Sequence, residues 1–454
     1  MESKYKVSKN ILYNFLGQIT LLILTIATAP FIINSLGHDK YGIFTLAITV
    51  VGYFSILDLG LGTSIIKFIS DSHSRDDKES LEKIINTALT SYMAIGFLGA
   101  VLIILFTQLI VRQALHIPVT LIPLALSVFY ISSLGFFVNM NLTVFNSIPT
   151  ALERMDITNN RNIIFGLLNT LGIVALLIFG QDLLPIIIWS ILISIVATVS
   201  FLKIIFNLLP NIKIKLGFDK ETFIKLVRFG LFKSIVNISG QIVFQLDRLL
   251  IGIFLPISAV TFYTAPAILA QRGFSALFNV TNAFFPAISS SYATADKQRV
   301  KELYLRMTKI IILLIFPVMA IIFLLAEDIL EIWLGSQFAF QSTSTLKILG
   351  VAYFLAAFSA PGVIVSDASN QPQIPAFFSI ISAVINLIAA LFLIPALGIE
   401  GAAWALVINF AAQIPIFLMI VHKKVLGISN LTVIGQSIIK PLLSGIITAV
   451  ILYI

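Results

Sequence analysis

The chain contains no cysteine among its 454 residues, and histidine occurs only four times. Without cysteine, disulfides, thiolate metal sites and cysteine nucleophiles are excluded. His38, His73, His116 and His422 are scattered, and they form neither an HxxxH nor an HExxH spacing. A metal enzyme is therefore not expected. We also predict no cofactor and no catalytic residues, and that the protein is not an enzyme.

Charge is also scarce, because Asp, Glu, Lys and Arg make up 11% of the residues while 58% are hydrophobic. Soluble domains carry roughly 25% charged residues. A soluble protein of this size needs polar groups over a large surface, so most of this surface is expected to face lipid. The net charge of +8 is explained better by basic cytoplasmic loops than by nucleic-acid binding. We expect membrane lipids, and no nucleic acid, as partners.

Thirteen apolar segments are long enough to cross a bilayer, for which roughly 20 residues are needed. The sequence thus predicts an all-α, polytopic membrane protein. No cleavable signal peptide is visible, since the first apolar run exceeds a signal h-region. The last run reaches the end of the chain, so a fourteenth helix and an outer C-terminus both stay open. The predicted spans are 11–36, 41–66, 84–111, 118–146, 162–181, 183–203, 229–254, 258–288, 303–325, 345–367, 373–396, 400–422 and 434–454.

The basic residues alternate between the two sides of these spans. We count Lys203 and Lys347, which stand at the ends of their spans, with the adjacent loops. With the N-terminus inside, 20 of the 29 Lys and Arg residues then lie in inner segments and six lie within spans. The three outer ones are Lys40, Arg112 and Lys347. Such a bias follows the positive-inside rule, which predicts a cytoplasmic N-terminus.

The longest basic loop separates two sets of six spans. We predict an N-terminal lobe at 1–203, a connecting loop at 204–228, a C-terminal lobe at 229–424 and an extra helix at 425–454. Gly17-Gln18-Ile19 before Tyr41 is echoed by Gly240-Gln241-Ile242 before Tyr263. Parallel six-helix repeats are related by a pseudo-twofold axis along the membrane normal and transport by rocking about a central cavity. Chance similarity between apolar segments is the alternative.

Three segments carry a family resemblance. LGHDKYGIFTLAITVVGYFSILDLGLGTSIIKFIS (36–70), QLDRLLIGIFLPISAVTFY (245–263) and LGIEGAAWALVIN (397–409) resemble the polysaccharide transporter family, which includes Wzx-type O-antigen flippases. This family lies within the multidrug, oligosaccharidyl-lipid and polysaccharide exporter superfamily. The resemblance implies two six-helix lobes that form a V.

The implied activity is a flippase of the bacterial cytoplasmic (inner) membrane. Its substrate would be an undecaprenyl-pyrophosphate-linked glycan, an O-antigen or capsule repeat unit, moved outward by alternating access. A polysaccharide polymerase is a further candidate partner.

Ionisable residues inside spans are costly and mark candidate sites. Arg272 lies near the middle of 258–288, and its guanidinium suits a pyrophosphate. A structural ion pair is the alternative. Asp247 and Arg248 are helix neighbours that point about 100° apart, so each needs another partner, and Arg272 is one candidate for Asp247. Lys233 lies four turns from Arg248 on nearly the same face, where snorkelling is the alternative.

The first half offers uncharged groups and one acid. Asn14 and Gln18 share a helix face and are candidates for sugar hydroxyls, although such groups more commonly join membrane helices. Asp58 lies in the DLGLG motif, where packing against Lys67 or the backbone is the favoured role.

A cation or drug antiporter of the same superfamily is the main rival function. Antiporters use buried carboxylates to exchange cations, whereas the predicted cavity is cationic and repels such substrates. A membrane glycosyltransferase or polymerase is disfavoured by the short outer loops. The chain has no Walker A motif, so it does not hydrolyse ATP through a P-loop.

Overall fold

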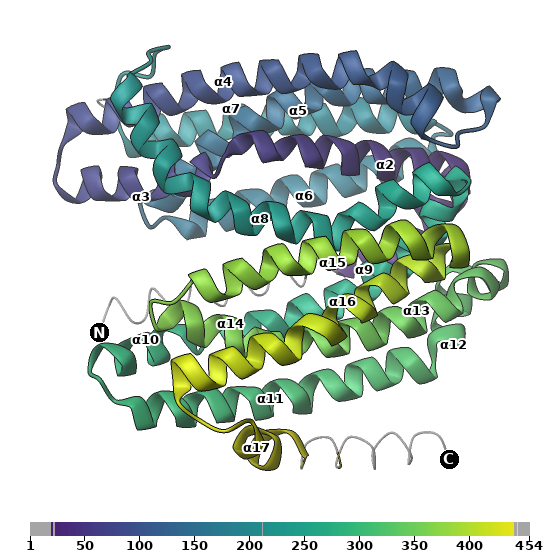
Figure 1. Cartoon of the computed structure of the whole chain (residues 1–454). Helices are drawn as coiled ribbons and strands as arrows, with labels where there is room; N and C mark the ends of the chain where they lie inside the picture. Colours follow the sequence, from purple (N-terminus) through teal and green to yellow (C-terminus); the bar gives the residue numbers. More distant parts are fainter. Residues whose placement is uncertain (1–19, 21–22, 211, 440–442, 444–454) are drawn as a thin grey trace. The chain divides into compact units, whose positions relative to one another are not determined.

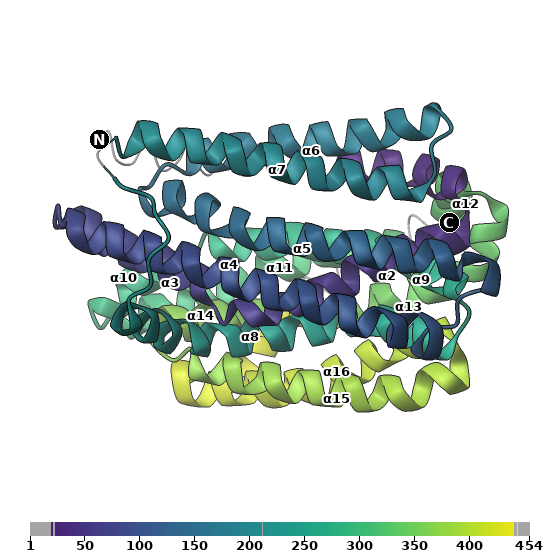
Figure 2. The same cartoon turned by 90° about the horizontal axis from the view of Figure 1, so that it is seen from above.

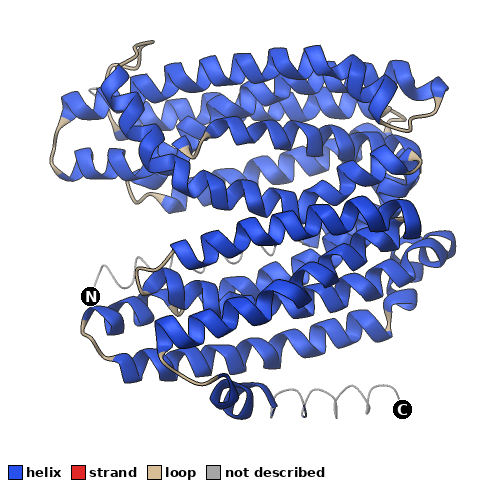
Figure 3. Cartoon of the chain, in the orientation of Figure 1, coloured by secondary structure: helices blue, strands red, loops and turns tan. Residues whose placement is uncertain are grey.

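The computed structural model describes residues 20, 23–210, 212–439 and 443. Nine helices among them are long and apolar enough to cross a membrane, and Figure 3 shows that helices joined by loops make up this part of the chain. The prediction of an all-α, multi-pass membrane protein is confirmed. The nine are His38–Asp58, Lys78–Ala114, Val119–Ala151, Met155–Ile178, Leu183–Leu208, Lys297–Leu324, Ser336–Ala368, Gln373–Leu397 and Ile399–Leu426.

The chain divides into two compact units. Unit 1 comprises residues 1–238 with 256–258, and unit 2 comprises 239–255 with 259–454. The division falls inside helix α8 (Lys220–Phe254), so the connecting loop and the first half of α8 belong to unit 1. The predicted lobes at 1–203 and 229–424 stay a proposal.

Unit 1 is a bundle of long helices. The helix Ile23–Leu36 precedes α2, and α4 packs along α5, which packs along α7 (Figures 1 and 2). Its core is formed by apolar side chains of α3, α4, α5 and α7. Its elements are α2 (His38–Phe54), η1 (Ser55–Asp58), α3 (Leu61–Ser74), α4 (Lys78–Leu109), η2 (Ile110–Ala114), η3 (Val119–Leu121), α5 (Ile122–Ala151), α6 (Met155–Ile178) and α7 (Leu183–Leu208).

Unit 2 is built in the same manner. The tightest hairpin joins α15 to α16, and α13 packs against α11, α12 and α16. Its elements after α8 are α9 (Ile257–Asn282), α10 (Phe285–Ala293), α11 (Lys297–Leu324), α12 (Ala326–Leu334), α13 (Ser336–Ala357), α14 (Ser359–Ala368), α15 (Gln373–Leu397), α16 (Ile399–Ile420), η4 (Val421–Leu426), α17 (Asn430–Val433) and η5 (Ile434–Ile438).

The predicted continuous span 41–66 is wrong, because the helix breaks at the DLGLG motif. Leu59 and Gly60 adopt φ angles of 50° and 70°, which end α2–η1 before α3 begins. The Gly60 carbonyl accepts from the Thr63 hydroxyl at 2.9 Å and from the Ser64 backbone amide at 3.3 Å. A backbone break inside a membrane requires such partners.

A second break separates α9 from α10 at residues 283–284 in unit 2. It follows Tyr263 by about as many residues as the first break follows Tyr41. This correspondence is what the predicted repeat requires. The repeat and its pseudo-twofold axis stay a prediction.

Helix α8 crosses the first break with its backbone in contact. A Cβ atom added at Gly230 would lie 2.6 Å from the Leu59 carbonyl oxygen, and one added at Gly60 would lie 2.2 Å from the Gly230 oxygen. The Ser64 hydroxyl also donates to the Leu226 carbonyl of α8 at 2.8 Å. Only glycine fits on both sides of this crossing, which fixes α8 against α3.

The segment before α8 is fastened to α4. Residues four apart on α4 are separated by about 6 Å along the helix axis. Two residues of an extended chain cover nearly the same distance, so side chains at this spacing on α4 contact alternate residues of the extended segment 212–219. Asp219 then caps α8 by accepting from the hydroxyl and amide of Thr222, which holds the pKa of Asp219 below its usual range. The contacts join Glu82 to Lys213 N, Asn86 to Lys213 O and Lys215 N, Thr90 to Gly217 N and O, and Thr87 to Asp219 N.

Gly230→Ala is expected to destabilise the protein, because the new methyl group meets backbone atoms that cannot rotate away. Overpacking of this kind costs about 1–3 kcal/mol or more. Gly240→Ala on the same helix is the control, since a Cβ there meets nothing within 4 Å. The melting temperature in detergent should fall for Gly230→Ala and change little for Gly240→Ala, and equal behaviour of the two variants would contradict the crossing.

Candidate functional site

An open pocket of about 530 Å3, which we call the cavity of unit 1, lies among α2, α5, α6 and α7. Its lining is mainly apolar and aromatic, with Phe44, Phe165 and Phe201 among it. Several amides and hydroxyls also face it, and none of the lining side chains is charged. These polar residues are Ser132, Asn139, Asn162, Asn169, Ser190 and Ser194.

Part of this polar lining has unused hydrogen-bonding capacity. Asn139 donates to the Gly135 carbonyl at 2.9 Å, which leaves its side-chain oxygen unengaged among the described residues. The buried side-chain oxygen of Asn169 likewise has no partner in the described part of the chain. A site with apolar and aromatic walls and a few polar groups is typical of ligand pockets. Uncharged acceptors and donors beside aromatic rings are suited to sugar hydroxyls and sugar ring faces.

Asp58 lies at the break between η1 and α3 in unit 1. Its carboxylate accepts a hydrogen bond from the hydroxyl of the fully buried Tyr92 on α4. The suggested partner Lys67 instead lies over the Phe229 ring, 4.0 Å from its centroid. Asp58 therefore ties the broken helix to α4, which is a structural role.

Asp247 forms the corresponding buried carboxylate of unit 2. It is 3% exposed and accepts from the hydroxyl of the buried Tyr263 and from the backbone amide of Arg248, the latter at 2.8 Å. The suggested ion pair with Arg272 is not formed, since the described residues contain no such contact within 4.0 Å. Asp247 joins α8 to α9 within this unit.

The predicted cations are placed separately. Arg248 is half-buried, and its Nε has no hydrogen-bond partner among the described residues. Arg272 is exposed on α9. Lys233 lies on the part of α8 that belongs to unit 1, so it is in a different unit from Arg248, and its side chain is outside the described part. Asn14 and Gln18 also lie outside the described residues.

The comparisons with known proteins identify the family. The model of the family described as polysaccharide biosynthesis protein matches residues 7–292, which is more than half of the chain. The chain belongs to this family. A MatE family model also matches residues 234–392.

Relatives of this polysaccharide biosynthesis protein extend over most of its length. A candidate O-antigen transporter of Shigella flexneri is 25% identical over 87% of this chain and 93% of its own. The membrane protein EpsK of Bacillus subtilis is 23% identical over 95% of this chain and 87% of its own. A glycan biosynthesis flippase, Agl15, of Haloferax volcanii is 29% identical but covers 41% of this chain and 40% of its own.

Solved structures share the fold at low identity. The inward closed form of the lipid II flippase MurJ aligns with a TM-score of 0.78 at 14% identity, over 97% of this chain and 91% of that one. An inward-facing MATE transporter aligns with a TM-score of 0.75 at 15% identity, over 90% and 98%. This family member therefore has the fold of the superfamily that its sequence motifs resemble.

Sequence reasoning missed the cavity of unit 1. Asn139, Asn162 and Asn169 stand in apolar helices, where single amides most often join neighbouring helices. Asn162 and Asn169 are seven residues apart, which places both on one face of α6. This spacing is the signal that could have indicated a shared surface. The contribution of α5 could not be found without the packing of the helices.

Tyr263→Phe is expected to destabilise this family member, because the buried carboxylate of Asp247 then loses a donor. Leaving a buried group unsatisfied costs about 1–3 kcal/mol. Tyr353→Phe is the control, since this equally buried hydroxyl has no hydrogen bond among the described residues. In thermal unfolding in detergent, the melting temperature should fall more for Tyr263→Phe than for Tyr353→Phe. An equal fall in both variants would show that the Asp247–Tyr263 hydrogen bond does not add to stability.

Proposed function

We propose that this protein is a flippase for lipid-linked glycans. The observation that carries the proposal is the uncharged, hydroxyl- and amide-bearing cavity inside the membrane helices of a polysaccharide biosynthesis protein. The names of the relatives, a candidate O-antigen transporter and a glycan biosynthesis flippase, support the same substrate class. An undecaprenyl-pyrophosphate-linked O-antigen or capsule repeat unit fits this class.

We place the protein in the bacterial inner membrane with a cytoplasmic N-terminus. The distribution of Lys and Arg supports this orientation. The end of unit 1 that carries the α3–α4 turn and the connecting segment is then cytoplasmic. Loading would occur from that side, release would occur outside, and a polysaccharide polymerase would receive the product.

The pyrophosphate is assigned to the unpaired cations of unit 2. Arg248 supports this role because its half-buried guanidinium keeps an Nε–H without a partner in the described part of the chain. Arg272 supports it because an exposed guanidinium on a membrane helix is costly unless it meets water or an anion. Lys233, Asn14 and Gln18 complete the proposed set, whereas the carboxylates of Asp58 and Asp247 hold neighbouring helices.

Arg272→Ala is expected to abolish or strongly reduce export in a flippase-deficient strain, because the anion then loses a charge-assisted contact, which is worth about 1.5–3 kcal/mol. Arg306→Ala should retain wild-type export, because this exposed arginine lies in the N-terminal half of α11, from where its side chain can extend to the membrane surface. Surface glycan is the readout. Normal export by Arg272→Ala would remove this residue from the site, and efflux of cationic drugs by the wild type without glycan export would favour the antiporter.

Asn139→Leu is expected to lower export about two- to tenfold, the value of one lost hydrogen bond. Asn141→Leu is a matched control, because both amides donate to the carbonyl four residues earlier, at 2.9 and 2.8 Å, while only Asn139 lines the cavity. Protein levels are measured in parallel. Equal export by the two variants would show that the cavity does not contact the glycan.

A further inference from the structure

Two lysines and two aromatic rings meet where α3 lies beside α8 in unit 1. The Lys67 ammonium lies 4.0 Å from the Phe229 centroid and 5.4 Å from the Phe68 centroid, and the Lys225 ammonium lies 4.7 Å from the Phe68 centroid. The rings themselves meet edge to face at 5.7 Å. We call Lys67, Phe68, Lys225 and Phe229 the cation–ring cluster.

The cluster is built on the most constrained contact of unit 1. It lies one helical turn beyond the hydrogen bond from Ser64 to the Leu226 carbonyl. The crossing of Gly60 and Gly230 is next to it in sequence on α8. The backbones of α3 and α8 are in contact there, so the crossing sets the distance between the two segments that carry the lysines.

The two ammonium groups lie near the same aromatic ring, and neither is held in an ion pair among the described residues. Both lie near the same Phe68 ring, so they are at most 10.1 Å apart. Neither forms an ion pair with a carboxylate in the described part of the chain. Cation–π contacts orient an ammonium and are worth about 0.5–1 kcal/mol at exposed sites, but they leave its charge in place. An anion that contacts both ammonium groups is attracted by both charges, and because both lysines are exposed this attraction weakens as salt is added.

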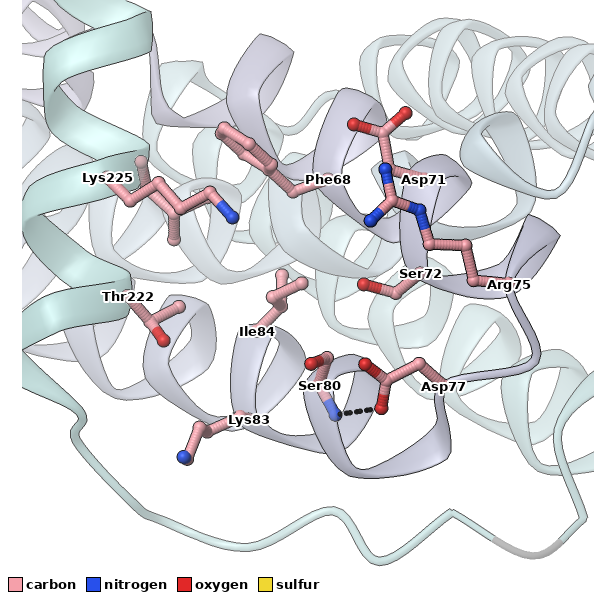
Figure 4. A pocket seen from close by; sticks show the side chains of 11 residues that line it. Phe68, Asp71, Ser72, Arg75, Asp77, Ser80, Lys83, Ile84, Thr222 and Lys225 are labelled. Carbon is pink, nitrogen blue, oxygen red and sulfur yellow. Dashed lines mark hydrogen bonds between the residues drawn. The ribbon is translucent and has the colours of Figure 1, made fainter.

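A pocket of about 160 Å3 adjoins the cluster among α3, α4 and the start of α8. Figure 4 shows Lys225 and Arg75 on opposite sides of this pocket, with Ser72 and Ile84 between them, while Lys83 extends away. The pocket holds two acids as well. The Asp77 carboxylate accepts a hydrogen bond from the Ser80 amide at 3.0 Å. Asp71 lies beside Arg75 in Figure 4. A hydrogen bond from an amide leaves the charge of a carboxylate in place. The pocket and the cluster together hold four cations, Lys67, Arg75, Lys83 and Lys225, against these two acids.

We propose that the cation–ring cluster and this pocket bind a phosphate-type anion carried by a lipid. The lysines would contact its oxygens at about 2.7–2.9 Å, and the exposed ring of Phe229 would contact the apolar part of the lipid next to the phosphate. Two sources share this chemistry, the pyrophosphate of a lipid-linked glycan and the phosphodiester of an anionic phospholipid. The first source rests on the proposed function and adds a second pyrophosphate contact to the one proposed at Arg248 and Arg272. The second source does not rest on the proposed function.

The test uses the full-length protein in phosphatidylcholine nanodiscs that contain either undecaprenyl pyrophosphate or phosphatidylglycerol. Bound lipid is counted by native mass spectrometry for the wild type and for Lys67→Gln with Lys225→Gln. The matched control is Lys213→Gln with Lys215→Gln, which removes two exposed lysines of the connecting segment whose backbone, and not side chains, contacts α4. Melting temperatures confirm that every variant is folded.

We expect the cluster variant to bind at least one of the two lipids about tenfold more weakly than the wild type, with the control within about twofold, a loss typical of charge-assisted contacts. Loss of undecaprenyl pyrophosphate alone identifies the transported substrate as the ligand. Loss of phosphatidylglycerol as well identifies a general lipid-phosphate site. Unchanged binding of both lipids by a folded cluster variant, or an equal loss in the control, overturns the proposal.

The proposed function is tested separately from this site. If the wild type exports no glycan but the cluster variant still loses phosphatidylglycerol, the flippase assignment fails while the anion site stands. If glycan export is normal and binding of both lipids is unaffected, the anion site fails while the flippase assignment stands.

Discussion

The backbone contact between Gly60 and Gly230 organises unit 1. A helix that breaks within a bilayer exposes carbonyl and amide groups that lipid cannot satisfy. Here the Thr63 hydroxyl and the Ser64 amide donate to the Gly60 carbonyl, and α8 packs over the break because neither glycine has a side chain. The break separates α2, which lines the uncharged cavity, from α3, which carries half of the cation–ring cluster. One local constraint thus positions two chemically different surfaces.

Most of the helical architecture could be predicted from the sequence, because a helix that crosses a bilayer needs a run of apolar residues as long as the bilayer is thick. The predicted spans 162–181 and 183–203 correspond to α6 and α7, and α7 continues only to Leu208. The span 41–66 was predicted as continuous because most of its residues are apolar. The two glycines of DLGLG indicate a kink, but they do not show that the helix ends at Leu59. The early start of α8 at Lys220 was missed because its first turns are polar and are stabilised by the Asp219 cap.

The partners of individual site residues could not be predicted. Asp247 is bound by Tyr263, a residue 16 positions away on the next helix, and a single sequence carries no sign of such a contact. Arg248 and Arg272 were predicted as site residues because charged side chains are rare in apolar segments. The cavity of unit 1 depends on Asn139 and similar uncharged groups, which are common in membrane helices and become informative only when four helices place them around one space.

The separation of uncharged and cationic groups within unit 1 follows from the cost of placing each in a membrane. An amide or hydroxyl can be satisfied within its own helix, as Asn139 is by the Gly135 carbonyl, so it is tolerated deep in a span. A lysine is tolerated where its ammonium reaches water, a ring or an anion, and Lys67 and Lys225 lie toward the end of unit 1 that also carries the basic connecting segment. A lipid-linked glycan presents the same two chemistries, sugar hydroxyls and a phosphate anion, on one molecule. A carrier of such a lipid therefore requires two separate surfaces. Cations placed among the sugar contacts would raise the free-energy cost of burying the cavity in the membrane, and amides already supply the hydrogen bonds that the sugars need.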